Sequence, residues 1–197
     1  MRMRYLTMLS LLAGAALFAP LSRAQVPVFA VTTGTSTIKF DVKASVPISG
    51  NFEKWSATLT FASPAATSAV LDIQIQAATV NTGSGMKNDK LKSKDFFDVE
   101  QNPLITFKST KVTQTGPTTF DVLGDFTIRG VSKPETLQLA ITGKGTGQGS
   151  IKGVMAFDRK DYGMNSGIPF IKIADRVEVD IDLKAKQLSG PKVTYKE

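Results

Sequence analysis

The stretch MKNDKLKSKDFFDVEQNPLITFKSTKV, residues 86–112, decides how the rest of the chain is organised. Its first part is polar and rich in lysine, its middle holds the adjacent rings of Phe96 and Phe97, and an alternating run begins after Pro103. Long irregular segments are uncommon in compact domains and are usually functional. Two large rings in a polar segment need apolar surface to cover. We therefore expect this segment to fold as a lid over one mouth of a larger structure.

On both sides of this stretch, apolar and polar residues alternate with the period of two that is typical of β-strands. In residues 176–184, for example, Val177 and Val179 alternate with Glu178 and Asp180. The pattern predicts eight strands, over residues 35–43, 55–61, 69–76, 104–112, 120–128, 135–142, 150–159 and 176–184. Gly124 interrupts the apolar face of residues 120–128, which predicts a kink or bulge there.

Short turn sequences join these strands, at residues 63–64, 115–117, 130–134 and 143–149. No amphipathic helix of ten residues lies between strands, which excludes a parallel sheet built from βαβ units. A short helix is expected within residues 86–95, in the insertion between the third and fourth strands. The prediction is an all-β fold, an eight-stranded antiparallel barrel with this helical insertion. A flattened barrel or sandwich is one alternative. An outer-membrane barrel is another, but these strands are short for one.

Residues 1–24 have the features of a secretory signal peptide. Arg2 and Arg4 precede an apolar run of about ten residues, roughly half of what a spanning helix needs. Small residues at Ser22 and Ala24 predict cleavage after Ala24. We therefore expect residues 25–197 to form a single domain located in the periplasm. An uncleaved membrane anchor is the disfavoured alternative.

Composition excludes several classes of function. The chain has no cysteine and no histidine, so disulfides, Ser-His-Asp or Cys-His catalysis and histidine-containing zinc sites are ruled out. Its formal net charge is +7, but it has no block of basic residues interleaved with aromatics. Nucleic acid is therefore not an expected partner. No metal or cofactor is predicted, and the remaining carboxylates and lysines show no catalytic spacing.

Three longer motifs carry a resemblance to a known family. They are LKSKDFFDVEQNPLITFKSTKV at residues 91–112, GDFTIRGVSKPETL at residues 124–137 and FDRKDYGM at residues 157–164. In this order they resemble the signatures of the YceI family, exported lipocalin-like proteins. The resemblance implies an eight-stranded barrel around a long apolar channel. It also implies that the channel binds a polyisoprenoid chain, such as an isoprenoid quinone or a polyprenyl lipid, and it implies no enzyme activity.

The sequence departs from this family at two positions. Val46 and Lys90 stand where family members commonly carry histidines. If those histidines contact the ligand's head group, the head-group preference of this chain is left open. The apolar positions of the tail pocket are all present.

The predicted ligand-binding residues are the apolar side chains expected to face the channel or the underside of the lid. They are Phe40, Trp55, Leu59, Phe61, Ile73, Ile75, Met86, Leu91, Phe96, Phe97, Ile105, Phe107, Phe126, Ile128, Met155, Phe157, Met164 and Phe170. A five-carbon isoprene unit buried among them would contribute roughly 3–4 kcal/mol, at about 0.8 kcal/mol per methylene.

Several alternatives stay open at this point. A protein-interaction or inhibitor module would use the barrel as a scaffold with a filled core. An enzyme acting on a lipid would need two carboxylates, such as Asp158 and Asp161, facing one cavity. The lysines of residues 87–94 are expected to form a solvated face, with transient contact to a membrane surface as the alternative. Arg129, Asp158, Arg159 and Asp161 are expected to form an ion-pair network that fixes turns rather than a head-group site. A homodimer is neither predicted nor excluded.

Overall fold

β-Strands account for most of the chain in the computed structural model, which describes residues 25–45, 47–167 and 171–197. The predicted signal peptide (residues 1–24), Val46 and Phe170 lie outside the described residues. The strands are β1 (Val28–Ala44), β2 (Ile48–Phe52), β3 (Trp55–Phe61), β4 (Ala69–Gln76), β5 (Val80–Asn81), β6 (Leu104–Gln114), β7 (Thr119–Ile128), β8 (Val131–Ile141), β9 (Gln148–Asp158) and β10 (Ile173–Ser189). The helices are α1 (Gly85–Lys92) and the short 3₁₀ turns η1 (Ala66–Ser68), η2 (Ala77–Thr79) and η3 (Arg159–Tyr162).

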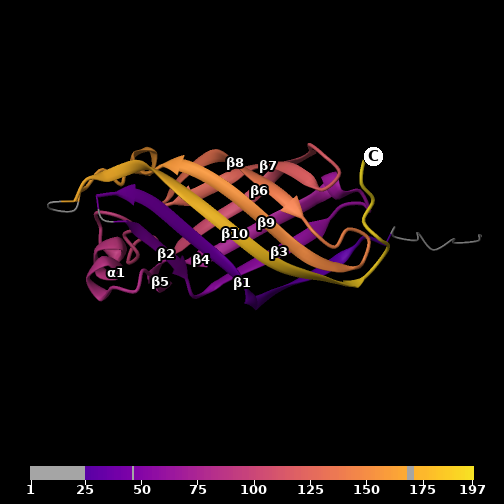
Figure 1. Ribbon diagram of the computed structural model, residues 1–197, viewed down its shortest axis with the longest axis horizontal. Helices are drawn as coiled ribbons and strands as arrows, with labels where there is room; N and C mark the ends of the chain where they lie inside the picture. Colours follow the sequence, from indigo (N-terminus) through magenta and orange to yellow (C-terminus); the bar gives the residue numbers. More distant parts are fainter. Residues whose placement is uncertain (1–24, 46, 168–170) are drawn as a thin grey trace, which may run out of the picture.

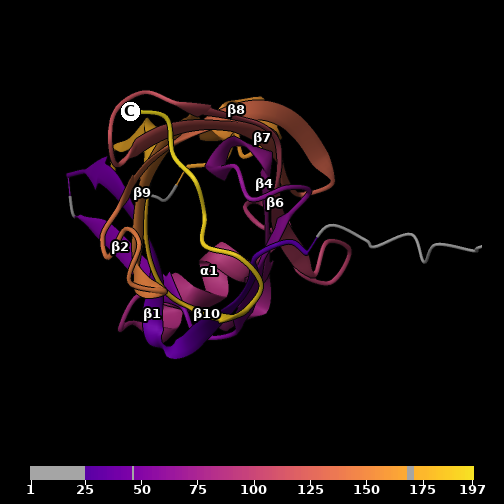
Figure 2. The same ribbon diagram turned by 90° about the vertical axis from the view of Figure 1, so that its right-hand side faces the viewer.

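All of these strands belong to one antiparallel sheet, in the order β3-β4-β6-β7-β8-β9-β10-β1-β2-β5. The sheet curls into a barrel-like shape that is elongated in Figure 1 and seen along its length in Figure 2. The two ends of the strand order are joined by backbone hydrogen bonds. Glu53 N donates to Thr79 O (3.1 Å), and Gln76 N donates to Lys54 O (2.9 Å). These hydrogen bonds join the link between β2 and β3 to the segment from the end of β4 to η2, so the two ends of the sheet meet.

The predicted number of eight strands is wrong: the described residues hold ten. The two additional strands, β2 and β5, are short and contain residues that rarely form strands, such as Gly50 and Asn51. Tertiary pairing supplies what the local sequence lacks, because β2 pairs with β1 from Lys39↔Asn51 to Val42↔Ile48. The helix lies where it was expected in the sequence, but in the observed fold it connects β5 to β6.

The turn between β7 and β8 also differs from the prediction. Residues 130–134 were expected to be a link, but β8 begins at Val131, and Ile128 pairs directly with Val131. Arg129 and Gly130 both have positive φ, 54° and 71°. Two such residues make the tight turn that matches the twist of a β-hairpin. The hairpin therefore needs only these two residues.

Gly124 marks an irregularity, as its position within a strand face predicts. The pairing of β6 with β7 shifts register between Ser109 and Lys111, and Ser109 is the partner of Gly124. A Cβ atom at Gly124 would lie 2.6 Å from Cζ of Phe107. The missing side chain therefore leaves room for the Phe107 ring inside the barrel.

The core fills the inside of the curled sheet. On β9, Met155 and Phe157 are buried and face the inside of the sheet, whereas Val154 is exposed. Phe126, Phe157 and Tyr162 pack at ring-centroid distances of 5.0–5.4 Å.

No helix within the described ranges has the length and apolar character needed to cross a membrane.

Candidate functional site

The barrel interior holds a cavity at the end where α1 lies. Its volume is about 70 Å³. Every residue of its wall is apolar except Arg159. The wall is made by Ile38, Phe40, Val42, Ile48, Phe52, Ile75, Leu91, Phe96, Phe97, Ile105, Phe126, Ile128, Phe157, Arg159, Met164, Ile173, Val177 and Val179. We call this space the lid-end cavity.

A second cavity lies at the opposite end and has a volume of about 120 Å³. Its deep wall is apolar, and its rim is polar. The apolar part comprises Phe29, Leu59, Phe61, Ala66, Ala69, Leu71, Val112, Phe120, Val122, Leu139, Ile141, Ile151, Ala185, Val193 and Tyr195. The rim comprises Thr142, Gly143, Gly145, Gly147, Gln148, Gly149, Ser150, Gln187 and Lys192. We call it the strap-end cavity, after residues 191–197, the strap, which cross this mouth (Figure 2).

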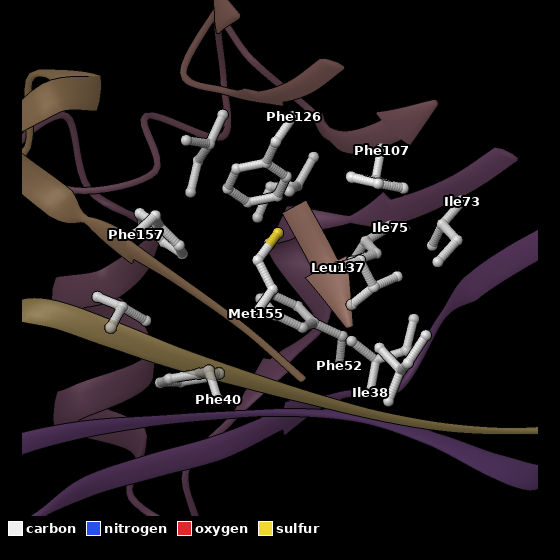
Figure 3. Close-up of a cluster of buried hydrophobic side chains, with 14 of the residues drawn as sticks. Ile38, Phe40, Phe52, Ile73, Ile75, Phe107, Phe126, Leu137, Met155 and Phe157 are labelled. Atoms are coloured by element: carbon white, nitrogen blue, oxygen red, sulfur yellow. The ribbon is translucent and has the colours of Figure 1, made fainter. Parts of the chain in front are cut away.

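A layer of side chains separates the two cavities. Along β4, for example, Leu71 lines the strap-end cavity, Ile75 lines the lid-end cavity, and Ile73 between them lines neither. The same order recurs on β6, β9 and β10. The buried residues between the cavities are Ile73, Phe107, Leu137, Met155, Ile181 and Leu183, which we call the middle layer. Figure 3 shows Ile73, Phe107, Leu137 and Met155 inside the barrel among the other core side chains. The interior is therefore neither one continuous tunnel nor completely filled.

The lid, residues 82–103, closes the barrel at the α1 end. The side chains of Leu91, Phe96 and Phe97 are buried, and the Phe97 ring lies 6.0 Å from that of Phe52. Backbone hydrogen bonds fix the chain beneath the helix, with Phe97 N donating to Leu91 O (2.9 Å) and Asp98 N to Ser93 O (2.9 Å). The two rings thus form the apolar underside of the lid, as the sequence predicts.

Arg159 is buried in the wall of the lid-end cavity, but its guanidinium is already bound. It donates to the carbonyl oxygens of Met164, Ser166 and Ala174 and pairs with Asp175 (3.0 Å). A hydrogen bond from Lys160, opposed by desolvation and assisted by the nearby charges, lowers the pKa of Asp175. The arrangement fixes the turn after β9 and leaves few donor groups of Arg159 for a ligand.

Comparison with known proteins identifies the family to which this fold belongs. Residues 29–185 match the YceI-like domain. The chain belongs to the YceI family. A UPF0312 protein of Pseudomonas savastanoi pv. phaseolicola is 28% identical over 145 residues, which cover 71% of this chain and 74% of that protein. BcnA of Burkholderia cenocepacia has a TM-score of 0.71 at 26% identity, covering 79% of this chain and 99% of BcnA.

A structure described as a polyisoprenoid-binding domain from Saccharophagus degradans is also similar. Its TM-score is 0.66 at 17% identity, and the match covers 82% of this chain and 99% of that domain. At this identity the likeness is one of fold. It supports the curled antiparallel sheet of this YceI-family protein.

The structure distributes the predicted ligand-binding residues over three places. The lid-end cavity is lined by Phe40, Ile75, Leu91, Phe96, Phe97, Ile105, Phe126, Ile128, Phe157 and Met164. Leu59 and Phe61 line the strap-end cavity, and Ile73, Phe107 and Met155 belong to the middle layer. Trp55 is half-buried against the core and lines neither cavity. Phe170 lies outside the described residues.

The placement of Met86 in the site is wrong. Its side chain is 84% exposed, because it lies in the first turn of α1 on the side that faces solvent. The buried anchor of this helix is Leu91, one of the predicted residues. The helix has a single buried position, so the sequence offered no helical periodicity with which to exclude Met86.

Most of the strap-end cavity was missing from the prediction. Phe120 and Val122 were recognised as inward-facing but were not assigned to the site. Val193 and Tyr195 follow the last predicted strand in a polar stretch, so no alternation marked them. The cavity could have been predicted from the apolar residues at the strand ends opposite the lid. The motifs around residues 91–112 do not include these strand ends.

The charged groups proposed from the sequence lie outside the two cavities, except Arg159. Asp158 and Asp161 are exposed; Asp158 accepts a hydrogen bond from Lys160 N (2.8 Å), and Asp161 pairs with Lys133 (3.1 Å). They do not face one cavity, so the hypothesis of a catalytic pair formed by these two carboxylates is wrong. The described residues also contain no cluster of acidic side chains suited to a metal ion.

Lys90 of α1 pairs with Asp95 of the lid at 2.5 Å. The hydrogen bond and charge of Lys90 lower the pKa of the Asp95 carboxyl. Lys87 donates to Pro47 O (3.2 Å). The Lys90 ion pair therefore stabilises the lid internally, and Lys87 bonds the lid to the residue before β2; the expectation of a purely solvated face included neither contact.

Proposed function

We propose that this protein binds an isoprenoid lipid, an isoprenoid quinone or a polyprenyl chain, inside the barrel for storage or transport in the periplasm. The observation that carries the proposal is the pair of apolar cavities at opposite ends of one barrel, separated by a single layer of side chains. Membership of the YceI family and the polyisoprenoid-binding domain of the same fold support it.

The size of the cavities indicates how a chain would be held. An engineered apolar cavity of about 150 Å³ holds one benzene molecule. Each cavity of about 70 or 120 Å³ therefore has room for about one isoprene-sized group. A longer chain must displace part of the middle layer. Burial of about 0.8 kcal/mol per methylene, or roughly 3–4 kcal/mol per isoprene unit, supplies a driving force for that displacement.

A scaffold for protein interaction, with a filled core and no ligand, is the second candidate. It predicts an interior packed to the density of an ordinary core, with few voids larger than a water molecule. Two cavities whose deep walls are apolar are a specific departure from that density. We therefore favour lipid binding.

Native mass spectrometry of the purified protein tests the proposal. We expect a bound species of isoprenoid mass after gentle ionisation, or binding of added ubiquinone with a short isoprenoid tail. The matched control is the same quinone ring without a tail, which should bind far more weakly because it buries fewer methylenes. Repeated failure to detect any bound lipid, natural or added, would contradict the function.

The periplasmic location has its own test. Expression of the full chain in a Gram-negative host should yield a periplasmic product with the mass of residues 25–197, since Ser22 and Ala24 predict cleavage after Ala24. An uncleaved product in the membrane fraction would favour an anchor instead.

A further inference from the structure

The strap, residues 191–197, crosses the barrel mouth opposite α1 (Figures 1 and 2). Its side chains Lys192, Val193 and Tyr195 form part of the wall of the strap-end cavity. The strap therefore covers part of the mouth of this cavity.

Few interactions hold the strap. Thr194 N donates to Pro64 O and Ala66 N donates to Thr194 O, both at 2.8 Å. The side-chain amide of Gln114 exchanges two hydrogen bonds of 2.8 Å with the backbone of Lys196. Val193 and Tyr195 are only half-buried, and the Tyr195 ring lies 6.3 Å from that of Phe120. Lifting the strap would break these hydrogen bonds and the one from Gln187 Nε2 to Pro191 O (2.7 Å), and it would expose the half-buried side chains of Val193 and Tyr195.

The loop between β8 and β9 lies beside the strap and has the same character. Gly143, Gly145 and Gly147 have φ between 73° and 81°. Lys144 Nζ lies 4.8 Å from the centroid of the Tyr195 ring, which joins the loop to the strap. Because glycines carry no side chain into the mouth, the loop adds little packing that would oppose opening.

The lid at the other end is held differently. It buries three large apolar side chains, Leu91, Phe96 and Phe97, and Lys87 of α1 donates to Pro47 O (3.2 Å). Opening it would expose those rings to water. The cavity behind it is also the smaller of the two, about 70 Å³ against about 120 Å³.

We propose that the strap is the movable cover of the port through which an isoprenoid chain enters and leaves the barrel. This inference rests on the lipid-binding function proposed above. The chain passes tail first beneath the strap, toward the middle layer and Phe97. Its polar end stays at the polar rim, near Gln148 and Lys192.

A reversible lock tests the port. Ala65 and Thr194 are paired in a parallel bridge, and neighbouring paired strands lie about 4.8 Å apart, within the range that a disulfide spans. The chain has no cysteine, so the double variant Ala65→Cys/Thr194→Cys forms one defined bond. The probe is geranylgeraniol, and its uptake and release are followed by time-resolved native mass spectrometry. The control is Thr127→Cys/Ser132→Cys, a pair whose hydroxyl oxygens are 3.0 Å apart on the β7–β8 hairpin, away from the strap.

We expect the oxidised lock to slow uptake and release by roughly tenfold or more, because a closed cover then limits both rates. The dissociation constant should stay nearly unchanged, since the strap is closed in both end states. Reduction should restore the rates, and the control disulfide should leave them unaltered.

Equal rates for the oxidised and reduced lock, with normal binding, would overturn the port while leaving the proposed function intact. Absence of binding in the natural protein as well would overturn the function itself. The substitution Tyr195→Ala provides a second measurement, because it removes the contacts with Phe120 and Lys144. It should speed uptake, and unchanged or slower uptake would count against the port.

Discussion

Phe107 is the residue on which the division of the interior depends. Its ring is buried in the middle layer and occupies the space over Gly124. Inward-facing Gly153 serves the same purpose on β9, because a Cβ there would lie 2.7 Å from Cγ1 of Ile181, another residue of the middle layer. Large side chains beside glycines thus complete a layer one residue thick.

Replacing Phe107 by Ala should destabilise the lipid-free protein by about 3–5 kcal/mol, because it removes a fully packed ring. It should also connect the two cavities and so strengthen binding of geranylgeraniol relative to the natural protein. Urea unfolding with and without the lipid measures both effects. Leu123→Ala, on the outer face of β7, is the control and should change stability by no more than about 0.5 kcal/mol. An equal, large loss of stability with and without lipid would instead indicate an ordinary filled core.

Tyr162 should make the stability of the protein depend on alkaline pH. Burial, reinforced by the hydrogen bond to Glu135 (3.0 Å), raises the pKa of Tyr162 above its ordinary value of 10.0. The folded state therefore keeps the phenol neutral where the unfolded chain would ionise. The resulting stability is complete below pH 10 and is lost as the pH rises toward the folded-state pKa.

The substitution Tyr162→Phe should cost about 1–2 kcal/mol near neutral pH, since the hydrogen bond to Glu135 is lost. Above pH 10 its stability should fall less steeply than that of the natural protein. Urea unfolding at a series of pH values measures this. Tyr195→Phe is the comparison: burial alone raises the pKa of Tyr195, without a carboxylate partner, so its pH profile should change less than that of Tyr162→Phe. Parallel pH profiles for Tyr162→Phe and the natural protein would contradict the assignment.

Among the elements, the lid is the one whose attachment depends on a few side chains. Phe97→Ala should loosen residues 93–99 before the barrel unfolds, because the ring that packs on Phe52 is removed. Hydrogen exchange of the Phe97 and Asp98 amides, both hydrogen-bonded in the lid, should accelerate relative to β-strand amides. Met86→Ala changes the same segment at an exposed position and should leave the exchange unaltered. Equal acceleration in both variants would show that the rings do not hold the lid.

The elements also show how far the sequence alone can predict this fold. The alternation of apolar and polar residues predicted the exact bounds of β3 and β4. Each of these strands, Trp55–Phe61 and Ala69–Gln76, turns one face toward the core. The alternation missed β2, where Gly50 and Asn51 are held in a strand by pairing with β1. It also missed the strap-end cavity, whose wall combines strand ends with Val193 and Tyr195 from a polar stretch. Local pattern identifies strands with one buried face, whereas tertiary pairing and the closure of the mouths are set by residues distant in sequence.

At the scale of the whole molecule, the proposed function links lipid binding to stability. A ligand that binds only the folded state at 100 times its dissociation constant stabilises that state by about 2.7 kcal/mol. For a domain of this size we expect geranylgeraniol to raise Tm by roughly 5–10 °C. Differential scanning calorimetry measures the shift, and the tail-free quinone ring is the control. An unchanged Tm at lipid concentrations that saturate native mass spectra would contradict binding to the folded barrel.

The middle layer also bears on stoichiometry. While Phe107, Leu137 and Met155 stay in place, the barrel has two separate chambers of about 70 and 120 Å³. Short isoprenoids could then occupy the two chambers independently of each other. A tail long enough to pass the layer would fill both chambers at once. The number of molecules bound per protein should therefore fall from two to one as the tail lengthens. The binding stoichiometry would thus report the length of the isoprenoid tail.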